Sequence, residues 1–142
     1  FIDIKRDNYF NAQSLLFARD KFFGTRDKWY SFKPEEFNTL KDKDPFEQVA
    51  GQVVYMRNAI DKGMSVIPEQ NKIVLDYNDF CDAPKNVLKQ IELKYMELDH
   101  QLNIDTIDTN LLNPFKNNNI NKLNKEDSTL LKKHLTTFTS KL

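Results

Sequence analysis

The chain has 142 residues and a mass of 16.8 kDa, the common size of one domain, and its 21 basic and 21 acidic side chains cancel. Nucleic-acid-binding domains usually carry a clear basic excess, so this balance does not favour a nucleic acid as partner. Charged residues make up 30%, the mean hydropathy is −0.66, and no apolar run approaches the ~20 residues that a membrane span requires. The sequence therefore predicts a single soluble domain over residues 1–142, without a membrane span.

The chain contains one cysteine, Cys81, which excludes an intramolecular disulfide and a zinc site built from several cysteines. Its apolar neighbours Phe80 and Ala83 favour a buried structural thiol over a nucleophile. The chain begins at Phe1 rather than Met, which predicts either a removed initiator, signal or anchor segment or a domain taken from a longer protein. The cellular compartment therefore stays open.

The first expected helix begins after Asp7 or Asn8, because both side chains accept hydrogen bonds from the free amides of a helix start, and it ends at Gly24. The next residues form an expected extended connection, since Pro34 disfavours helical backbone at the residue before it. A short helix is expected from Pro34 to Leu40.

The clearest helix start is Asp44-Pro45-Phe46-Glu47, with an acceptor at the cap, proline at the first helical position and glutamate at the third. Apolar residues then recur at helical spacing up to Ile60, and Gly63 follows. This pattern predicts a helix over residues 45–62.

Residues 72–77 contain the Ile-Val-Leu run of a short buried strand, but Ile73, Tyr77 and Phe80 also fit one helical face. No partner strand is evident elsewhere, and a lone strand leaves its backbone groups unpaired. We therefore expect helix within residues 66–81 and keep a short strand near 72–77 as the alternative.

Asp82, as an N-cap before Ala83-Pro84, predicts the start of the longest helix, whose apolar seam extends to Leu102 and favours packing within a bundle over an intermolecular coil. An asparagine-rich polar run then predicts a mobile low-complexity loop near residues 113–124. Asn124, with Asp127 three residues later, predicts the start of the last helix.

These elements together predict an all-α fold, an antiparallel bundle of four to five helices. The composition of 11 Phe, 5 Tyr and 1 Trp predicts a core rich in aromatic side chains. A homo-oligomer is left open by the sequence.

Glu97 and His100 have the Glu-x-x-His spacing by which di-metal helical bundles place two ligands on one face. The other histidine, His134, is preceded at that spacing by Leu131, so the second half of such a site is missing. We therefore expect a solvated helix pair and no metal.

Asp76, Asp79 and Asp82 are spaced by three but lack the glycine turn of a calcium loop. The three glycines are too dispersed for a phosphate-binding loop, and no serine-based catalytic turn is present. We expect no cofactor, and the sequence favours a non-enzymatic role without excluding catalysis by scattered side chains.

The candidate protein-binding residues are Trp29, Tyr30 and Phe32, in an aromatic stretch flanked by basic side chains. Aromatic residues often anchor protein interfaces, although a bundle poor in aliphatic residues also needs them in its core. Trp29 and Tyr30 are expected to be the more exposed rings.

The sequence therefore predicts a non-enzymatic helical domain for protein–protein interaction, as an adaptor or regulator, with another protein as its partner. The alternative is an extracytoplasmic ligand-binding or sensor bundle, detached from an N-terminal anchor that preceded Phe1.

Overall fold

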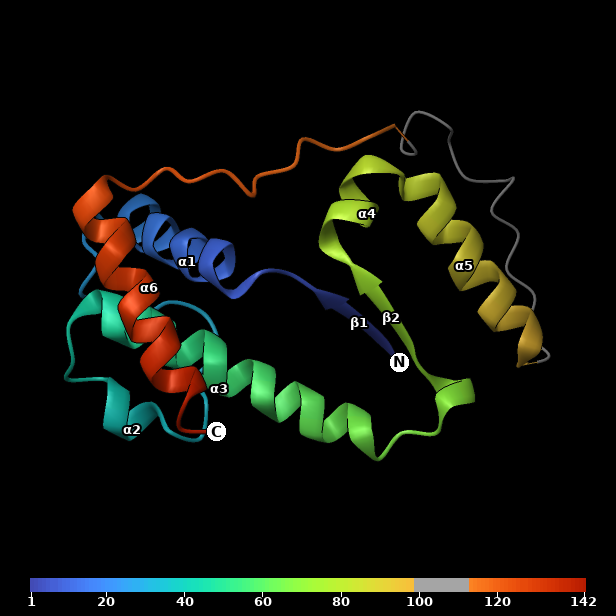
Figure 1. Cartoon of the computed structure of the whole chain (residues 1–142), viewed down its shortest axis with the longest axis horizontal. Helices are drawn as coiled ribbons and strands as arrows, with labels where there is room; N and C mark the ends of the chain where they lie inside the picture. Colours follow the sequence, from blue (N-terminus) through green and yellow to red (C-terminus); the bar gives the residue numbers. More distant parts are fainter. Residues whose placement is uncertain (99–112) are drawn as a thin grey trace. The chain divides into compact units, whose positions relative to one another are not determined.

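The computed structural model describes residues 1–98 and 113–142, and these are predominantly helical (Figure 1). The elements in chain order are β1 (Ile2–Lys5), α1 (Asn8–Phe23), α2 (Phe37–Leu40), α3 (Pro45–Ser65), the 3-10 turn η1 (Glu69–Asn71), β2 (Ile73–Asp76), α4 (Tyr77–Asp82), α5 (Pro84–Glu97) and α6 (Lys125–Thr139). The expected helical character is confirmed, whereas an antiparallel bundle of four to five helices is not.

The contacts divide the chain into two compact units. The mixed unit consists of Phe1–Arg6 and Met64–Asn118, and the helical unit consists of Asp7–Gly63 and Asn119–Leu142. Each unit is therefore assembled from segments that are distant in the sequence. The expected single domain over residues 1–142 stays a prediction.

The helix starts depend on side-chain caps that the sequence predicts. Asp7 accepts hydrogen bonds from the backbone N–H groups of Tyr9 and Phe10 at 2.8 and 3.4 Å, and it begins α1. Asp44 does the same for Phe46 and Glu47 at 2.9 and 3.1 Å. These bonds satisfy amides that have no partner within the helix, so they fix where the helix begins.

Asn124 caps α6 in the same way, accepting from the Asp127 N–H at 2.8 Å. At the other end of α1, Gly24 adopts φ = 68°, a left-handed conformation that glycine reaches without a steric penalty. The boundaries expected for α1, α3 and α6 are therefore confirmed within a few residues.

The region of residues 66–81 differs from the expected helix. Strand β2 occupies Ile73–Asp76 and pairs in parallel with β1, with Ile2 opposite Ile73 and Ile4 opposite Leu75. The helical expectation is wrong there, and the alternative of a short strand is confirmed. Its partner strand is the N-terminal Ile2–Lys5, which is too short for its periodicity to identify it.

Asp76 is the N-cap of α4 and accepts from the Asn78 N–H at 2.7 Å, whereas the expected cap Asp82 is the last residue of α4. Helix α5 begins at Pro84 without a side-chain cap, because the N-cap residue is Ala83, whose side chain has no acceptor. The end of the expected apolar seam, Leu102, lies outside the described residues.

The polar segment of residues 113–124 forms neither helix nor strand. In the mixed unit, Phe115 donates its backbone N–H to the Cys81 carbonyl at 2.8 Å, and the Asn117 amide donates to Asn78 Oδ1 at 2.9 Å. In the helical unit, the buried Gln13 side chain donates to the Ile120 carbonyl at 2.9 Å. The segment is irregular as expected, and specific hydrogen bonds hold it at several points.

The core of the helical unit is mainly aliphatic, which corrects the expectation of an aromatic core. Its fully packed residues are Ala12, Leu16, Leu40, Val49, Ala50, Val53, Val54, Leu123, Leu131 and Phe138. Five rings of this unit, including Tyr9, Phe17 and Tyr55, are partly buried against that core. The broad aromatic rings therefore cover the edges of the core, while the smaller side chains fill the space between α1, α3 and α6.

Two glycines of α3 offer a matched test of this packing. A Cβ added at Gly51 would lie 2.5 Å from Leu40 Cδ2 and 3.2 Å from Phe138 Cζ, and both side chains are buried and have little room to move. A Cβ added at Gly63 meets nothing within 4 Å. We predict that Gly51→Ala lowers the free energy of unfolding by about 1–3 kcal/mol through overpacking.

Gly63→Ala should instead raise the free energy of unfolding by about 0.5–1 kcal/mol, because alanine restricts the unfolded chain and favours helix. Urea unfolding monitored by far-ultraviolet circular dichroism measures both variants. Equal effects of the two substitutions would contradict the close approach of α2 and α6 to Gly51.

Candidate protein-binding surface

Four large aromatic side chains belong to the end of α1 and to the connection that follows it. We call Phe22, Phe23, Tyr30 and Phe32 the aromatic surface. The Phe22 and Tyr30 rings are stacked, with centroids 5.2 Å apart and planes at 14°, and Phe23 meets Tyr30 edge to face at 6.2 Å. The exposed fractions are 58% for Phe22, 41% for Phe23 and 76% for Phe32. Phe22 and Phe23 thus contact Tyr30 at the surface, and Phe32, the most exposed of these rings, follows Tyr30 by two residues.

The three residues predicted from the sequence differ in their surroundings. Trp29 is half-buried against the core, where its ring meets Phe37 edge to face at 4.8 Å and its indole N–H donates to the Phe32 carbonyl at 3.2 Å. Tyr30 is half-buried in its stack, and Phe32 is largely exposed. The expectation that Trp29 and Tyr30 are the more exposed rings is wrong, because both are half-buried whereas Phe32 is exposed.

A buried arginine, Arg19, lies in α1, the helix that also carries Phe22 and Phe23. Arg19 is fully buried on the inner face of α1, and its guanidinium donates to the Gln48 amide oxygen at 2.7 Å and to the Arg26 carbonyl at 3.0 Å. The guanidinium carbon lies 5.2 Å from the Trp29 ring centroid. Burial lowers the pKa of Arg19 and the Asp27 carboxylate opposes this effect, but an arginine remains charged at any physiological pH.

Two buried glutamines extend this network to the backbone. The Gln52 amide donates to the carbonyls of Tyr30 and Phe32, at 3.0 and 2.8 Å, and its oxygen accepts from Arg19 at 3.5 Å. The Gln48 amide donates to the carbonyls of Lys41 and Lys43, at 3.0 and 2.7 Å. The network therefore holds the backbone on both sides of Ser31 and also fixes the turn before α3.

Ser31 has φ = 71°, the left-handed region that residues with a Cβ seldom adopt, at a cost of roughly 1–2 kcal/mol. The two carbonyls held by Gln52 belong to the residues immediately before and after it. The hydrogen bonds from α3 thus stabilise a backbone conformation that directs the flanking rings outward.

The aromatic surface has basic side chains around it. The ammonium groups of Lys21 and Lys28 lie 5.7 and 5.9 Å from the ring centroids of Phe22 and Phe23, respectively, and that of Lys33 lies 4.3 Å from the Phe37 centroid. Each distance is within the range of a cation–π contact. Lys21 and Lys28 therefore lie beside rings of the aromatic surface, whereas Lys33 lies beside Phe37. The same stretch of chain also carries the carboxylates of Asp27, Glu35 and Glu36.

Arg26, in the same stretch of chain, is paired with two carboxylates. Its guanidinium binds Asp20 at 2.8 Å and Asp127 at 3.5 Å, joining α1 to α6. The hydrogen bond that Arg26 donates to Asp20 is the main reason why the pKa of Arg26 is raised, and the partial burial of Arg26 acts in the opposite direction. Arg26 therefore has a structural role beside the surface.

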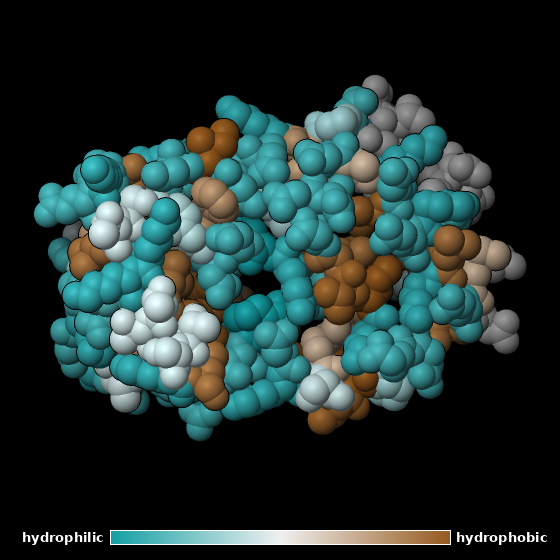
Figure 2. All heavy atoms as spheres, viewed as in Figure 1, coloured by the Kyte–Doolittle hydropathy of each residue, from teal (hydrophilic) through white to brown (hydrophobic). Residues whose placement is uncertain are grey.

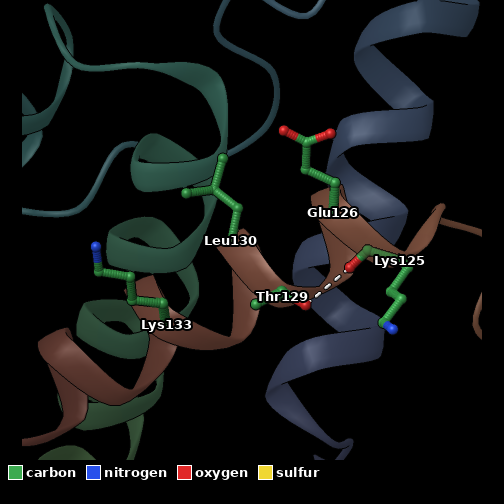
Figure 3. Close-up of a pocket in the computed structure, with 5 residues that line it drawn as sticks. All are labelled: Lys125, Glu126, Thr129, Leu130 and Lys133. Carbon is green, nitrogen blue, oxygen red and sulfur yellow. Dashed lines mark hydrogen bonds between the residues drawn. The ribbon is translucent and has the colours of Figure 1, made fainter.

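A depression beside α6 is a weaker candidate site (Figure 3). It measures about 510 Å³, but its lining residues, Lys125, Glu126, Thr129, Leu130 and Lys133, all belong to this one helix. In Figure 3 the labelled side chains diverge, and Thr129 donates back to the Lys125 carbonyl at 2.8 Å. A depression with one wall and no convergent polar groups does not provide a catalytic geometry.

Two further cavities are small. A groove of about 260 Å³ lies beside Tyr55 and Met56 of α3, below the roughly 300–1,000 Å³ typical of ligand pockets. In the mixed unit, apolar side chains gather over β1 and β2 (Figure 2), and a cavity of about 60 Å³ lies between the strands and α5. The groove beside Tyr55 is also lined by the charged side chains of Lys33, Glu35, Glu36 and Lys62, whereas mainly apolar side chains line the cavity in the mixed unit.

The metal and nucleophile candidates give no assembled site within the described residues. No three His, Cys, Asp or Glu side chains of residues 1–98 and 113–142 come close enough together to hold a metal ion. Glu97 lies at the end of α5, and its predicted companion His100 lies outside the described residues. Cys81 is buried in α4, next to Tyr77.

Comparison with protein families, with curated proteins and with solved structures finds no match to this chain. None of the helices in the described ranges has the length and hydropathy that crossing a bilayer requires.

The buried network gives a direct stability test. Gln52→Met keeps the length of the side chain but leaves the Tyr30 carbonyl without its donor, while the Phe32 carbonyl keeps only the Trp29 indole N–H. We predict a loss of about 1–3 kcal/mol in the free energy of unfolding, the cost of one buried unsatisfied group. The exposed Gln70→Met is the control and should change stability by less than about 0.5 kcal/mol.

Trp29 is the single tryptophan, so its emission reports on the same segment. The Gln52→Met variant should shift that emission to longer wavelength in the native protein. An unchanged emission and an unchanged midpoint of unfolding would show that Gln52 does not hold the connection.

Tyr77 gives a pH test in the mixed unit. Its pKa is raised, mainly by the hydrogen bond with Cys81 and also by burial, while Arg6, 4.6 Å from the ring centroid, acts in the opposite direction. The folded protein therefore holds the phenol proton more tightly than the unfolded chain, whose tyrosines titrate near pH 10. This stabilisation is complete below about pH 10 and is lost as the pH rises through the folded pKa.

We predict that wild type loses more stability than Tyr77→Phe when denaturant unfolding is measured from pH 9 to pH 11. Parallel stability profiles for the two proteins would contradict the raised pKa.

Proposed function

We propose that this protein is a non-enzymatic interaction domain that binds another protein through the aromatic surface. The observation that carries the proposal is the exposure of Phe22, Phe23 and Phe32, together with the hydrogen bonds from Gln52 of α3 that hold the backbone of Tyr30 and Phe32. Aromatic side chains are enriched at the anchor points of protein interfaces, because each buries a large area with few rotatable bonds.

The exposed rings do not contribute the free energy of folding that their burial would provide. Burying a phenylalanine side chain contributes about 1.5–3 kcal/mol, and Phe22 and Phe32 forgo much of that contribution. Contiguous apolar surface on a folded domain often marks a site of interaction. The cost therefore favours a binding role over an incidental exposure.

The backbone beneath the rings is already ordered, which reduces the entropy lost on binding. The Gln52 amide donates to the carbonyls of Tyr30 and Phe32, and the Trp29 indole N–H also donates to the Phe32 carbonyl. The strained Ser31 lies between these two carbonyls in the chain. In this proposal Phe22 and Phe32 are the anchors, Tyr30 orients Phe22 by stacking, and Trp29 supports the backbone.

The alternative of a small-ligand sensor has less support. The groove beside Tyr55 is lined by several polar side chains, but at about 260 Å³ it is smaller than a typical ligand pocket, and the depression on α6 has a single wall. A protein partner requires no enclosed cavity, only an exposed surface with fixed anchors.

The experiment compares the full chain with the double variant Phe22→Ser, Phe32→Ser in affinity capture from an extract of its source. The control is Val66→Ser, which removes an equally exposed apolar side chain (82%) from the mixed unit. We expect a stoichiometric protein retained by wild type and by the control and lost by the double variant.

Titration calorimetry with the purified partner should then show an affinity at least about 10-fold weaker for the double variant, as expected for the loss of interface anchors. Binding of every captured protein with equal affinity by the double variant would overturn the proposal. Catalytic turnover that depends on one side chain of the chain would also overturn it.

A further inference from the structure

We propose that the groove beside Tyr55 binds a free amino acid that has an apolar side chain. The groove measures about 260 Å³ and lies within the helical unit, between α3 and the connection that leads to α2. The four residues of the aromatic surface do not belong to its lining. The inference is therefore independent of the proposed function.

Two segments of the chain form the walls of this groove. Helix α3 contributes Tyr55, Ala59 and Lys62, whose spacings of four and three residues place them on one helical face. Residues 33–36 form the other wall. The backbone of this wall is ordered, since the Glu36 carbonyl accepts from the Thr39 N–H at 2.9 Å. The groove thus differs from the depression on α6, which one helix lines alone.

The lining of the groove carries charges of both signs. Lys33 and Lys62 supply ammonium groups, and Glu35 and Glu36 supply carboxylates. The Lys33 ammonium lies 4.3 Å from the Phe37 ring centroid, and this cation–π contact restricts its position. Within residues 1–98 and 113–142, neither Glu35 nor Glu36 forms an ion pair. The groove therefore offers two carboxylates whose charge no cation of the described residues neutralises.

A zwitterion matches this mixture of charges. At neutral pH a free amino acid carries an ammonium group and a carboxylate on the same carbon. The glutamates can accept from the ammonium group and the lysines can donate to the carboxylate, in charge-assisted hydrogen bonds. An anion without an ammonium group would be repelled by Glu35 and Glu36, and an amine without a carboxylate would be repelled by the two lysines.

Two uncharged polar side chains of α3 also line the groove. Tyr55 and Asn58 are half-buried, and in the part of the chain that the structure describes neither side chain forms a hydrogen bond. The Tyr55 ring packs edge to face against Phe138, with centroids 5.5 Å apart, which fixes its position. A hydroxyl and an amide can each donate and accept, so these two groups can bind either end of a zwitterion.

The apolar part of the lining and the size of the groove limit the rest of the ligand. Pro34, Met56 and Ala59 provide the surface against which an aliphatic side chain packs. The volume is below the roughly 300–1,000 Å³ typical of pockets for drug-sized ligands, so a nucleotide is too large. A single amino acid with an aliphatic side chain, such as leucine or methionine, satisfies both limits.

The test begins with saturation-transfer NMR of the full chain in mixtures of the twenty free amino acids. We expect transfer to leucine and methionine and little to glycine, which has no side chain to contact Met56. Calorimetry then compares leucine with N-acetyl-leucine, which lacks the ammonium group, and with leucinamide, which lacks the carboxylate. Each analogue should bind at least about 10-fold more weakly than leucine, because it loses a charge-assisted hydrogen bond.

Two double variants assign the two ends of the ligand. Glu35→Gln, Glu36→Gln should bind leucine at least about 10-fold more weakly and should no longer distinguish it from N-acetyl-leucine. Lys33→Gln, Lys62→Gln should likewise no longer distinguish leucine from leucinamide. This coupling between one end of the ligand and one pair of side chains would not follow from a general loss of structure.

The matched control is Glu126→Gln, Lys133→Gln, which removes the same two charge types from exposed positions beside the depression on α6. It should bind leucine as wild type does. Far-ultraviolet circular dichroism and Trp29 emission verify that each variant is folded.

Three outcomes would overturn the inference. The first is the absence of saturation transfer to any amino acid, and the second is equal affinity of wild type for leucine and its two analogues. The third is the loss of leucine binding in Phe22→Ser, Phe32→Ser, because it would place the ligand on the aromatic surface. Retention of leucine binding by that variant supports the groove as the site, whether or not a protein partner is lost.

Discussion

The helical unit depends on a buried positive charge that is hydrogen-bonded to neutral groups. Arg19 spreads its charge over the amide oxygens of Gln48 and Gln52 and the carbonyl of Arg26. A buried charge without such partners would cost several kcal/mol of folding free energy. Moving any segment that supplies one of these oxygens would therefore destabilise the fold. The same glutamines donate to four further carbonyls, which lie in the connection after α1 and in the turn before α3. Irregular backbone that would otherwise need water is thus satisfied from the inner face of a helix.

Much of the helical pattern could be predicted from the sequence because helix ends are decided locally. Asp7, Asp44 and Asn124 bind amides two or three residues away, and these bonds depend on no distant contact. The sheet could not be predicted in the same way. Strand β2 is paired with residues about 70 positions earlier, and four residues are too few to define a strand by alternation. Parallel pairing of such distant segments is a property of the folded chain.

The candidate surface was predicted only in part, for a related reason. The sequence indicated the right segment, residues 29–32, but ranked the exposure of its rings wrongly. Spacing along a helix does not show that the polar Arg19 faces inward while Phe22 and Phe23 face outward. That exchange occurs because the network of Arg19, Gln48 and Gln52 occupies space that an aromatic core would otherwise fill. A run of buried polar residues at helical spacing, such as Gln48 and Gln52, is the signal that could have identified it.

The arrangement separates stability from recognition. Gln52 holds the connection through the carbonyls of Tyr30 and Phe32, not through their side chains, so any residue at position 32 can be supported by the same hydrogen bonds. The exposed rings can therefore change with the partner while the core and its buried charge stay as they are. Conversely, a change in the network alters the backbone of Tyr30 and Phe32 together, because Gln52 binds both carbonyls. The exposed ring of Phe32, which belongs to the proposed binding surface, and the carbonyl by which Gln52 holds the fold are thus different groups of the same residue.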